Sequence, residues 1–389
     1  MVWFIAIACA VLTTVCACFP VAADKPTDAD LRSAKWWLAR AEEETAKLTK
    51  PHHQAETSAN LAVVCAKNNQ IDAFAVAAKR ASDAGGRLSD VAQYVMVKSR
   101  LAVSFAIAKD ANAFQAIVDQ FNEQLQILIE LDALDEQVEI DQSDHARERL
   151  RKIKSMLEKV KLGADESDLT CLLVASIEMR LGLFDQSRQT MKAVGSKWIR
   201  VGFLARFTVE QVRQGASSVV EAQGGLSSIE KYLDASRLDN TADVYREIVK
   251  AYAAIGDIEN ALRVLERVTG PVNRAAALCE LARAQSDKKD RAACAKSLIA
   301  AKLAVESISV PDERTGDLQL YRAEYWSVLA AAYMHCDQSP ALHRLYTDET
   351  DALQRANMAI GAADELWRIN RDKDQKEKAA KDAKGVPSP

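Results

Sequence analysis

Apolar side chains recur every three or four residues along almost the whole chain from position 24 onward. This spacing matches the 3.6-residue turn of an α-helix and gathers the apolar side chains on one face. Glycine and proline, which interrupt helices, number only 14 and 8 in 389 residues, and no run of alternating strand-type residues stands out. The sequence therefore predicts an all-α protein.

The segment 244–268 shows the unit from which such a protein is built. Its first half places Tyr245, Ile248 and Tyr252 on one helical face. Gly256 then permits a turn, because glycine accepts a positive φ without steric conflict. A second amphipathic stretch follows, with Leu265 on its apolar face. Neither helix can bury its apolar stripe alone, so we expect the two to pack as an antiparallel hairpin.

The positions within these hairpins resemble those of tetratricopeptide repeats. That family places an aromatic residue, a leucine, a small residue and a tyrosine along its first helix, and this chain has the same order in Trp326, Leu329, Ala330 and Tyr333. The unit over 244–268 departs from the pattern in having Val249 where a small residue is usual. The resemblance implies a right-handed solenoid of stacked hairpins, whose first helices line a concave groove that holds an extended peptide or a partner helix.

A small residue, or the valine that replaces it, marks each first helix along the chain. Successive markers are separated by 40, 73, 30, 44, 33 and 48 residues, and the longest step leaves room for a degenerate unit around residues 124–161. We therefore expect about seven or eight hairpins in a repeat domain over residues 24–370. The markers are Ala62, Ala102, Ala175, Ala205, Val249, Ala282 and Ala330.

Residues 1–23 carry no charged side chain and are typical of a signal peptide. Val21 and Ala23 are small enough for signal peptidase, which would cut before Asp24. Two alternatives stay open because the segment lacks the usual initial Lys or Arg: lipidation at Cys18, and retention of the segment as a membrane anchor. We expect export to the periplasm or the outside, with membrane contact only through an uncleaved or lipidated N-terminus.

The opposite end of the chain has a different composition. Residues 371–389 are rich in charge and end in Gly-Val-Pro-Ser-Pro, so they have little apolar surface to bury. We expect a disordered tail there. The formal net charge of −4 shows no basic excess, which argues against a nucleic-acid partner.

Five cysteines follow the predicted cleavage site, an odd number without a closely spaced pair. A framework of disulfides is therefore not expected. Cys279 and Cys294, on opposite sides of a predicted hairpin, are the pair that could still oxidise outside the cytoplasm.

No catalytic motif stands out. The chain has no Gly-x-Ser-x-Gly nucleophile elbow, no glycine-rich phosphate loop after a strand and no His-Glu-x-x-His. His335, Cys336 and His343 form one grouping of metal-type residues, which their position at a predicted turn explains more simply. We expect no catalytic residue, no metal and no cofactor. The alternative is an enzyme or small-ligand-binding protein on a helical toroid, glycosidase-like, with two carboxylates opposed across a deep pocket.

These observations favour a scaffold or adaptor that binds a protein or peptide. A lipid-anchored envelope assembly factor is a further alternative, distinguished by the fate of Cys18. Several residues expected on the open side of the first helices are basic, which suits an acidic segment or a free carboxylate. The candidate partner-binding residues are Arg180, Arg246, Lys250, Arg283, Met334 and His335.

Overall fold

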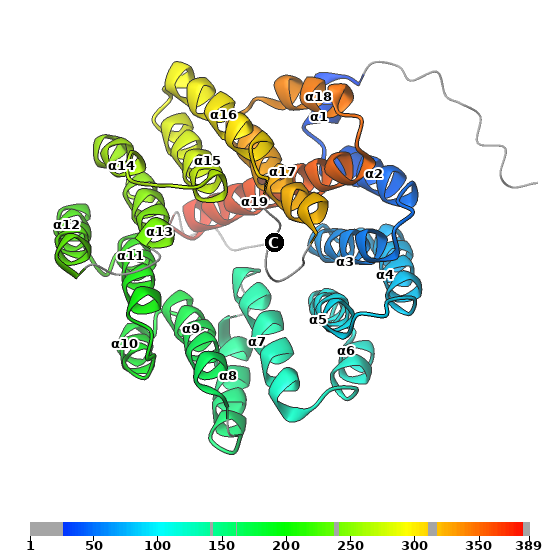
Figure 1. Ribbon diagram of the computed structural model, residues 1–389, viewed down its shortest axis with the longest axis horizontal. Helices are drawn as coiled ribbons and strands as arrows, with labels where there is room; N and C mark the ends of the chain where they lie inside the picture. Colours follow the sequence, from blue (N-terminus) through cyan, green and yellow to red (C-terminus); the bar gives the residue numbers. More distant parts are fainter. Residues whose placement is uncertain (1–25, 141–142, 161, 237–240, 310–316, 384–389) are drawn as a thin grey trace, which may run out of the picture.

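The computed structural model describes residues 26–140, 143–160, 162–236, 241–309 and 317–383 (Figure 1). Every regular element in these ranges is a helix, which confirms the predicted all-α class. The predicted signal peptide over residues 1–23 and the last six residues of the predicted tail lie outside them.

The helices are mostly 8 to 18 residues long. In chain order they are α1 (Asp28–Leu31), α2 (Ala34–Ala46), α3 (Pro51–Lys67), α4 (Ile71–Gly85), α5 (Val91–Ile107), α6 (Ala111–Val118), α7 (Glu123–Glu139), α8 (Ser143–Leu157), α9 (Ala164–Arg180), α10 (Phe184–Lys192), α11 (Lys197–Arg213), α12 (Val219–Ser236), α13 (Thr241–Ala254), α14 (Ile258–Leu265), α15 (Pro271–Asp287), α16 (Arg291–Glu306), α17 (Leu318–His335), α18 (Ser339–Asp348) and α19 (Ala352–Ala383).

Neighbouring helices pack in the order of the chain. From α3 onward, each odd-numbered helix packs against the even-numbered helix that follows it and against the next odd-numbered helix. This gives eight consecutive pairs, from α3 with α4 to α17 with α18, in the described part of the chain. Two helices, α7 and α8, occupy the interval around residues 124–161. Figure 1 shows the odd-numbered helices from α3 to α17 on the inside of a ring and their even-numbered partners outside them.

The ring closes because the last helix packs beside the first ones. Helix α19 contacts α17 on one side and α3 on the other, and α2 covers it from outside. We call this junction of α19 with α2, α3 and α17 the seam. A polar contact also stabilises it: Glu44 of α2 forms an ion pair of 2.9 Å with Arg355 of α19. Trp37 of α2 is fully buried, and its indole nitrogen donates a hydrogen bond of 2.9 Å to the carbonyl oxygen of Leu31. The repeat pattern did not predict this closure.

Small residues allow the inner helices to approach closely. All seven markers lie on inner helices, and each has no exposed surface. The tightest approach is at Gly361 of α19, where a Cβ atom would lie 2.7 Å from the carbonyl carbon of Ser327 in α17 and closer still to its oxygen. Any side chain at position 361 would therefore push α19 away from α17.

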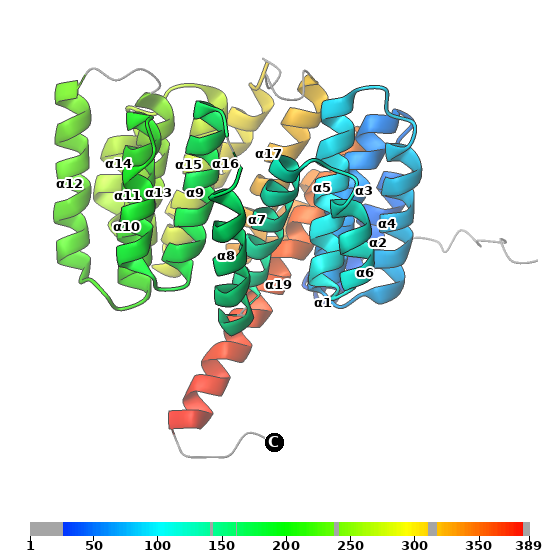
Figure 2. The same cartoon turned by 90° about the horizontal axis from the view of Figure 1, so that it is seen from below.

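Helix α19 does not end where the tail was predicted to begin. It continues through residue 370 to Ala383, and its last turns extend beyond the ring (Figure 2). Residues 372–378 are exposed there. The helix thus both closes the ring and projects from it.

We predict that Gly361→Ala destabilises the protein by at least ~2 kcal/mol, because an added methyl group in a filled space forces the surrounding backbone to move. Chemical denaturation followed by circular dichroism measures the change. Gly224→Ala is the matched control, since a Cβ atom at that helical position meets nothing within 4 Å. The control should be neutral or stabilising by about 0.5–1 kcal/mol. Equal stability of the two variants would contradict the close packing of α19 on α17.

Candidate functional site

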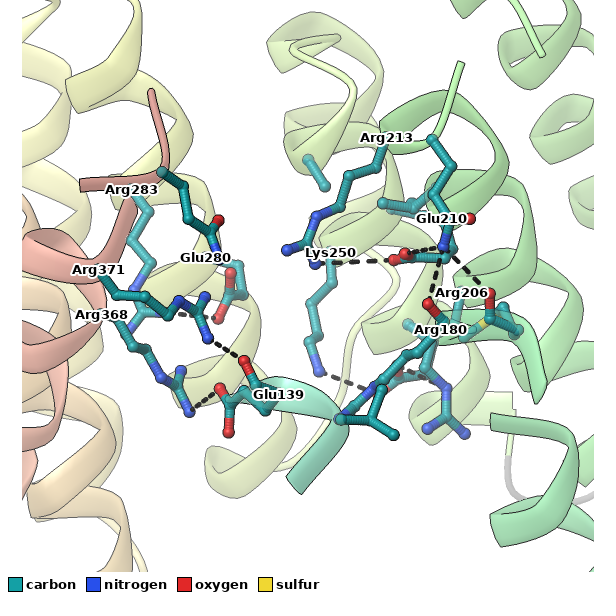
Figure 3. A pocket seen from close by; sticks show the side chains of 18 residues that line it. Glu139, Arg180, Arg206, Glu210, Arg213, Lys250, Glu280, Arg283, Arg368 and Arg371 are labelled. Carbon is teal, nitrogen blue, oxygen red and sulfur yellow. Dashed lines mark hydrogen bonds and ion pairs between the residues drawn. The ribbon is translucent and has the colours of Figure 1, made fainter. Parts of the chain in front are cut away.

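A cavity of about 680 Å³ lies at the centre of the ring. Six inner helices contribute to its wall: α7, α9, α11, α13, α15 and α19. Seven basic side chains line it against four acidic ones (Figure 3). The basic residues are Arg180, Arg206, Arg213, Lys250, Arg283, Arg368 and Arg371, and the acidic residues are Glu139, Glu210, Glu247 and Glu280.

Helical geometry explains why these residues share one wall. In α11, Arg206, Glu210 and Arg213 are separated by four and three residues, so they lie on the same face. The same spacing relates Glu247 and Lys250 in α13. The opposite face of each helix carries the buried apolar residues, which fixes the charged face toward the centre.

Two of the four acidic side chains, Glu247 and Glu210, are more deeply buried than their basic partners Lys250 and Arg213. Glu247 has only 10% of its side chain exposed and forms ion pairs with Arg246 at 3.1 Å, Lys250 at 3.4 Å and Arg206 at 3.6 Å. Burial alone would raise the pKa of this carboxyl group, but Lys250, Arg206 and Arg246 outweigh burial and hold its pKa below the usual range. Glu247 is therefore a buried anion that anchors cations around it.

The outer layer of this wall is cationic. Arg213 has 70% of its side chain exposed, while its partner Glu210 has 13% exposed. On α19, burial would lower the pKa of Arg368, yet Asp364 and Glu139 outweigh burial and raise it, so the guanidinium stays charged. Around Glu210 and Glu247, the groups that a ligand would meet first are thus basic.

A smaller cavity of about 270 Å³ on the other side of the ring has a balanced charge. Its basic and acidic residues are equal in number: Lys67, Arg100 and Arg368 against Glu136, Glu324 and Asp364. Lys67 is almost completely buried and forms ion pairs with Glu136, Glu139 and Asp364, at 2.8, 3.2 and 3.4 Å. Of these two cavities, the larger one therefore has the excess of positive charge.

Three of the six predicted binding residues line the larger cavity: Arg180, Lys250 and Arg283. Arg246 instead lines a separate cavity of about 130 Å³ and donates a hydrogen bond of 2.7 Å to Asn273. Met334 is buried in the core, with 4% exposure, so its side chain is not available to a partner. The expected exposure of Met334 is wrong for this reason.

His335 joins three helices instead of facing the larger cavity. Its Nδ1 atom lies 2.9 Å from Glu365 of α19, and its Nε2 atom lies 3.1 Å from Asp287 of α15. His343, which the sequence grouped with it, packs against Trp36 with ring centroids 5.8 Å apart. The two histidines thus have different surroundings. His335 bridges helices through Glu365 and Asp287, and His343 packs against Trp36.

The cavity residues follow a register that the marker positions define. In α9, α11, α13 and α15, most charged residues of the cavity stand two before, one after or five after a marker, as Glu247, Lys250 and Arg180 do relative to Val249 and Ala175. Arg246 stands three before its marker, one residue from these positions. One helical residue corresponds to a rotation of about 100°, which turns a side chain from the cavity wall into the contacts between helices.

The same register could have found two residues that the sequence interpretation missed. Arg206 immediately follows Ala205. Arg213 lies seven residues further along, about two helical turns, on the same face of α11. Glu139 was hidden because Leu134, which is fully buried, stands where other units have a small residue. Arg371 belongs to α19, which has no marker.

The five cysteines of the described residues are all free, including Cys279 and Cys294, the pair considered for oxidation. Burial raises the pKa of the Cys279 thiol to about 12, so it stays protonated at neutral pH. A metal ion has a different candidate site within the described ranges, where donor atoms of His52, His53 and Asp317 lie within 4.8 Å of one another.

Comparison of the chain with known protein families, curated proteins and solved structures finds no match. In the part of the chain that the structure describes, no helix has the length and apolar character needed to cross a bilayer.

The contacts of His335 generate a pH-dependent prediction. The hydrogen bond with Glu365 raises the pKa of His335 above its ordinary value of 6.5, although burial opposes this. A raised folded-state pKa means that the charged imidazole stabilises the fold fully below pH 6.5, and that this stabilisation is lost as pH rises through the folded-state pKa. We expect His335→Asn to destabilise the protein by about 1–2 kcal/mol at pH 5.5 and by less at pH 8.5.

Urea denaturation of the two proteins across this pH range measures the difference. His343→Asn is the control, because burial lowers the pKa of His343 and its contribution should show the opposite trend with pH. A deficit for His335→Asn that stays constant or grows as pH rises would contradict the charged bridge.

Proposed function

We propose that the protein is an exported helical-repeat scaffold that binds an acidic segment of a partner protein in its central cavity. One observation carries the proposal: the larger cavity has seven basic residues against four acidic ones, and the best-buried acids lie beneath the basic groups. A ligand that supplies carboxylates would complete this arrangement of charge.

The chemistry of the wall favours carboxylates over other ligands. Six of the seven basic residues are arginines, whose planar guanidinium groups can form two parallel hydrogen bonds with one carboxylate. Arg213 and Arg180 retain 70% and 38% side-chain exposure, so both can reach a ligand while their intramolecular partners stay in place. The volume of about 680 Å³ lies in the range that holds a short peptide segment or a small ligand.

Binding is better supported than catalysis at this site. A glycosidase-like mechanism needs one carboxylic acid that is protonated near neutral pH and a second carboxylate across the cleft. Glu247 has a lowered pKa, and ion pairs also involve Glu139, Glu210 and Glu280. These four side chains supply charge for positioning arginines, which is the arrangement of a binding wall.

The resemblance to tetratricopeptide repeats supports the same proposal, because their first helices line the surface that recognises a peptide. Here the inner helices carry the charged faces in one common register. Export rests on the predicted signal peptide over residues 1–23. We therefore place the partner in the periplasm or outside the cell, where an adaptor of this kind would join it to an assembly.

A labelled peptide of six glutamates tests the proposal. We expect the unmodified protein to bind it at low salt and to lose affinity as salt rises, because screening weakens attraction between exposed charges. Combined replacement of Arg180, Arg213 and Lys250 by Gln should raise the dissociation constant at least ~10-fold, which corresponds to a loss of about 1.4 kcal/mol in binding free energy. Fluorescence anisotropy measures both effects.

A second triple variant controls for total charge. Lys79, Lys192 and Lys296 are exposed on the outer helices α4, α10 and α16, and replacing them by Gln removes the same three charges. This variant should bind the acidic peptide as the unmodified protein does. A peptide of six lysines should bind neither the unmodified protein nor either triple variant. If both triple variants lose the same affinity, or the lysine peptide binds equally well, the cavity is not the binding site.

A further inference from the structure

Three metal-type side chains converge at the seam of the ring, away from the larger cavity. His52 and His53 stand in the first turn of α3, and Asp317 caps the start of α17. The Nε2 atoms of the two histidines lie 2.7 and 2.8 Å from the same oxygen, Oδ2 of Asp317. The two imidazole rings are 4.3 Å apart between centroids. The two histidines thus meet one oxygen atom of a residue that lies more than 260 positions further along the chain.

The carboxylate at the centre of this group is held in place by its second oxygen. Oδ1 of Asp317 accepts hydrogen bonds from the backbone N–H groups of Gln319, at 2.8 Å, and Leu320, at 3.1 Å. This helix cap fixes the orientation of Asp317 and leaves Oδ2 directed at the histidines. Contacts of this kind behind a ligand are a usual feature of protein metal sites, because they reduce the freedom that the ligand loses on binding.

Burial restricts the three side chains further. His53 has 6% of its side chain exposed, Asp317 has 18% and His52 has 25%. The group is therefore mostly enclosed, and His52 gives it an opening to solvent. An ion could reach it without unfolding of the seam, and water could occupy coordination positions that the protein leaves open.

We propose that His52, His53 and Asp317 bind a borderline transition-metal ion, of which Zn²⁺ is the representative. Two imidazole nitrogens and one carboxylate oxygen are a donor set that such ions accept and that Mg²⁺ and Ca²⁺, which prefer oxygen, do not favour. Zinc bonds of about 2.0–2.1 Å in a tetrahedral arrangement place donor atoms roughly 3.3 Å apart. The donor atoms here lie within 4.8 Å of one another, and the two nitrogen–oxygen separations need to widen by about half an ångström.

Metal binding at this position would act on ring closure. The ion would join α3 to α17, which are two of the helices that contact α19, and so hold the last helix between them. The three donors come together only when the seam is formed. An ion that binds the folded chain alone stabilises it in proportion to the logarithm of the ion concentration above the dissociation constant.

Isothermal titration of the purified, tag-free chain with ZnSO₄ tests the site. We expect one ion per chain with a dissociation constant of about 10 µM or tighter, and no saturable binding of MgCl₂ or CaCl₂. His52→Gln and Asp317→Asn should each weaken Zn²⁺ binding at least tenfold. Asn also caps helices well, so the second variant keeps the start of α17 while removing the anionic oxygen. His343→Gln, a histidine outside the group, should bind Zn²⁺ as the unmodified chain does.

Thermal unfolding gives an independent readout. Saturating Zn²⁺ should raise the unfolding temperature of the unmodified chain and of His343→Gln, and should raise that of His52→Gln and Asp317→Asn by less. Circular dichroism without metal verifies that these variants retain their helix content. Absence of saturable Zn²⁺ binding by the unmodified chain, or equal Zn²⁺ affinity in folded His52→Gln and Asp317→Asn, would overturn the proposal. If either variant fails to fold, the other decides, and the unmodified chain must still bind one ion.

Discussion

Close backbone approach between inner helices is the constraint on which the rest of this structure depends. Where α19 crosses α17, Gly361 leaves no room for even one methyl group. Small buried residues occupy the corresponding inner face in most other units. Because each inner helix touches two inner neighbours, its rotation about its own axis is fixed. That rotation decides which side chains face the centre of the ring, so helix packing determines the composition of the cavity.

The distribution of charge in the cavity follows from this packing. Carboxylates such as Glu247 and Glu210 are drawn into the wall, where water cannot solvate them fully, and they are stable there because basic neighbours surround them. The longer arginine side chains extend past them toward the centre, as Arg213 does. A chain with a formal net charge of −4 thus has a basic interior surface. The overall charge of the sequence gives no indication of this local excess.

Local features were predictable from the sequence, and long-range ones were not. Apolar periodicity predicted the helices, and the small-residue markers identified seven of the inner helices. The unit containing Leu134 was recognised only as a gap, because a large residue fills the marker position. Arg246 was assigned to the open face with an error of one residue, which no apolar pattern could correct. Helix α19 departs from the repeat, so neither its place between α17 and α3 nor the contribution of Arg371 to the cavity has a local signal.

The pairing of α2 with α19 also has a consequence for biosynthesis. A ribosome releases α2 roughly 300 residues before its partner α19, so Trp37 and Leu38 lack part of their native cover until α19 has been synthesised. The first helix must therefore stay solvent-accessible or associate with other proteins while the middle pairs form. The contacts of α19 with α2 and α3 can therefore form only after the pairs between neighbouring helices of the middle have been synthesised.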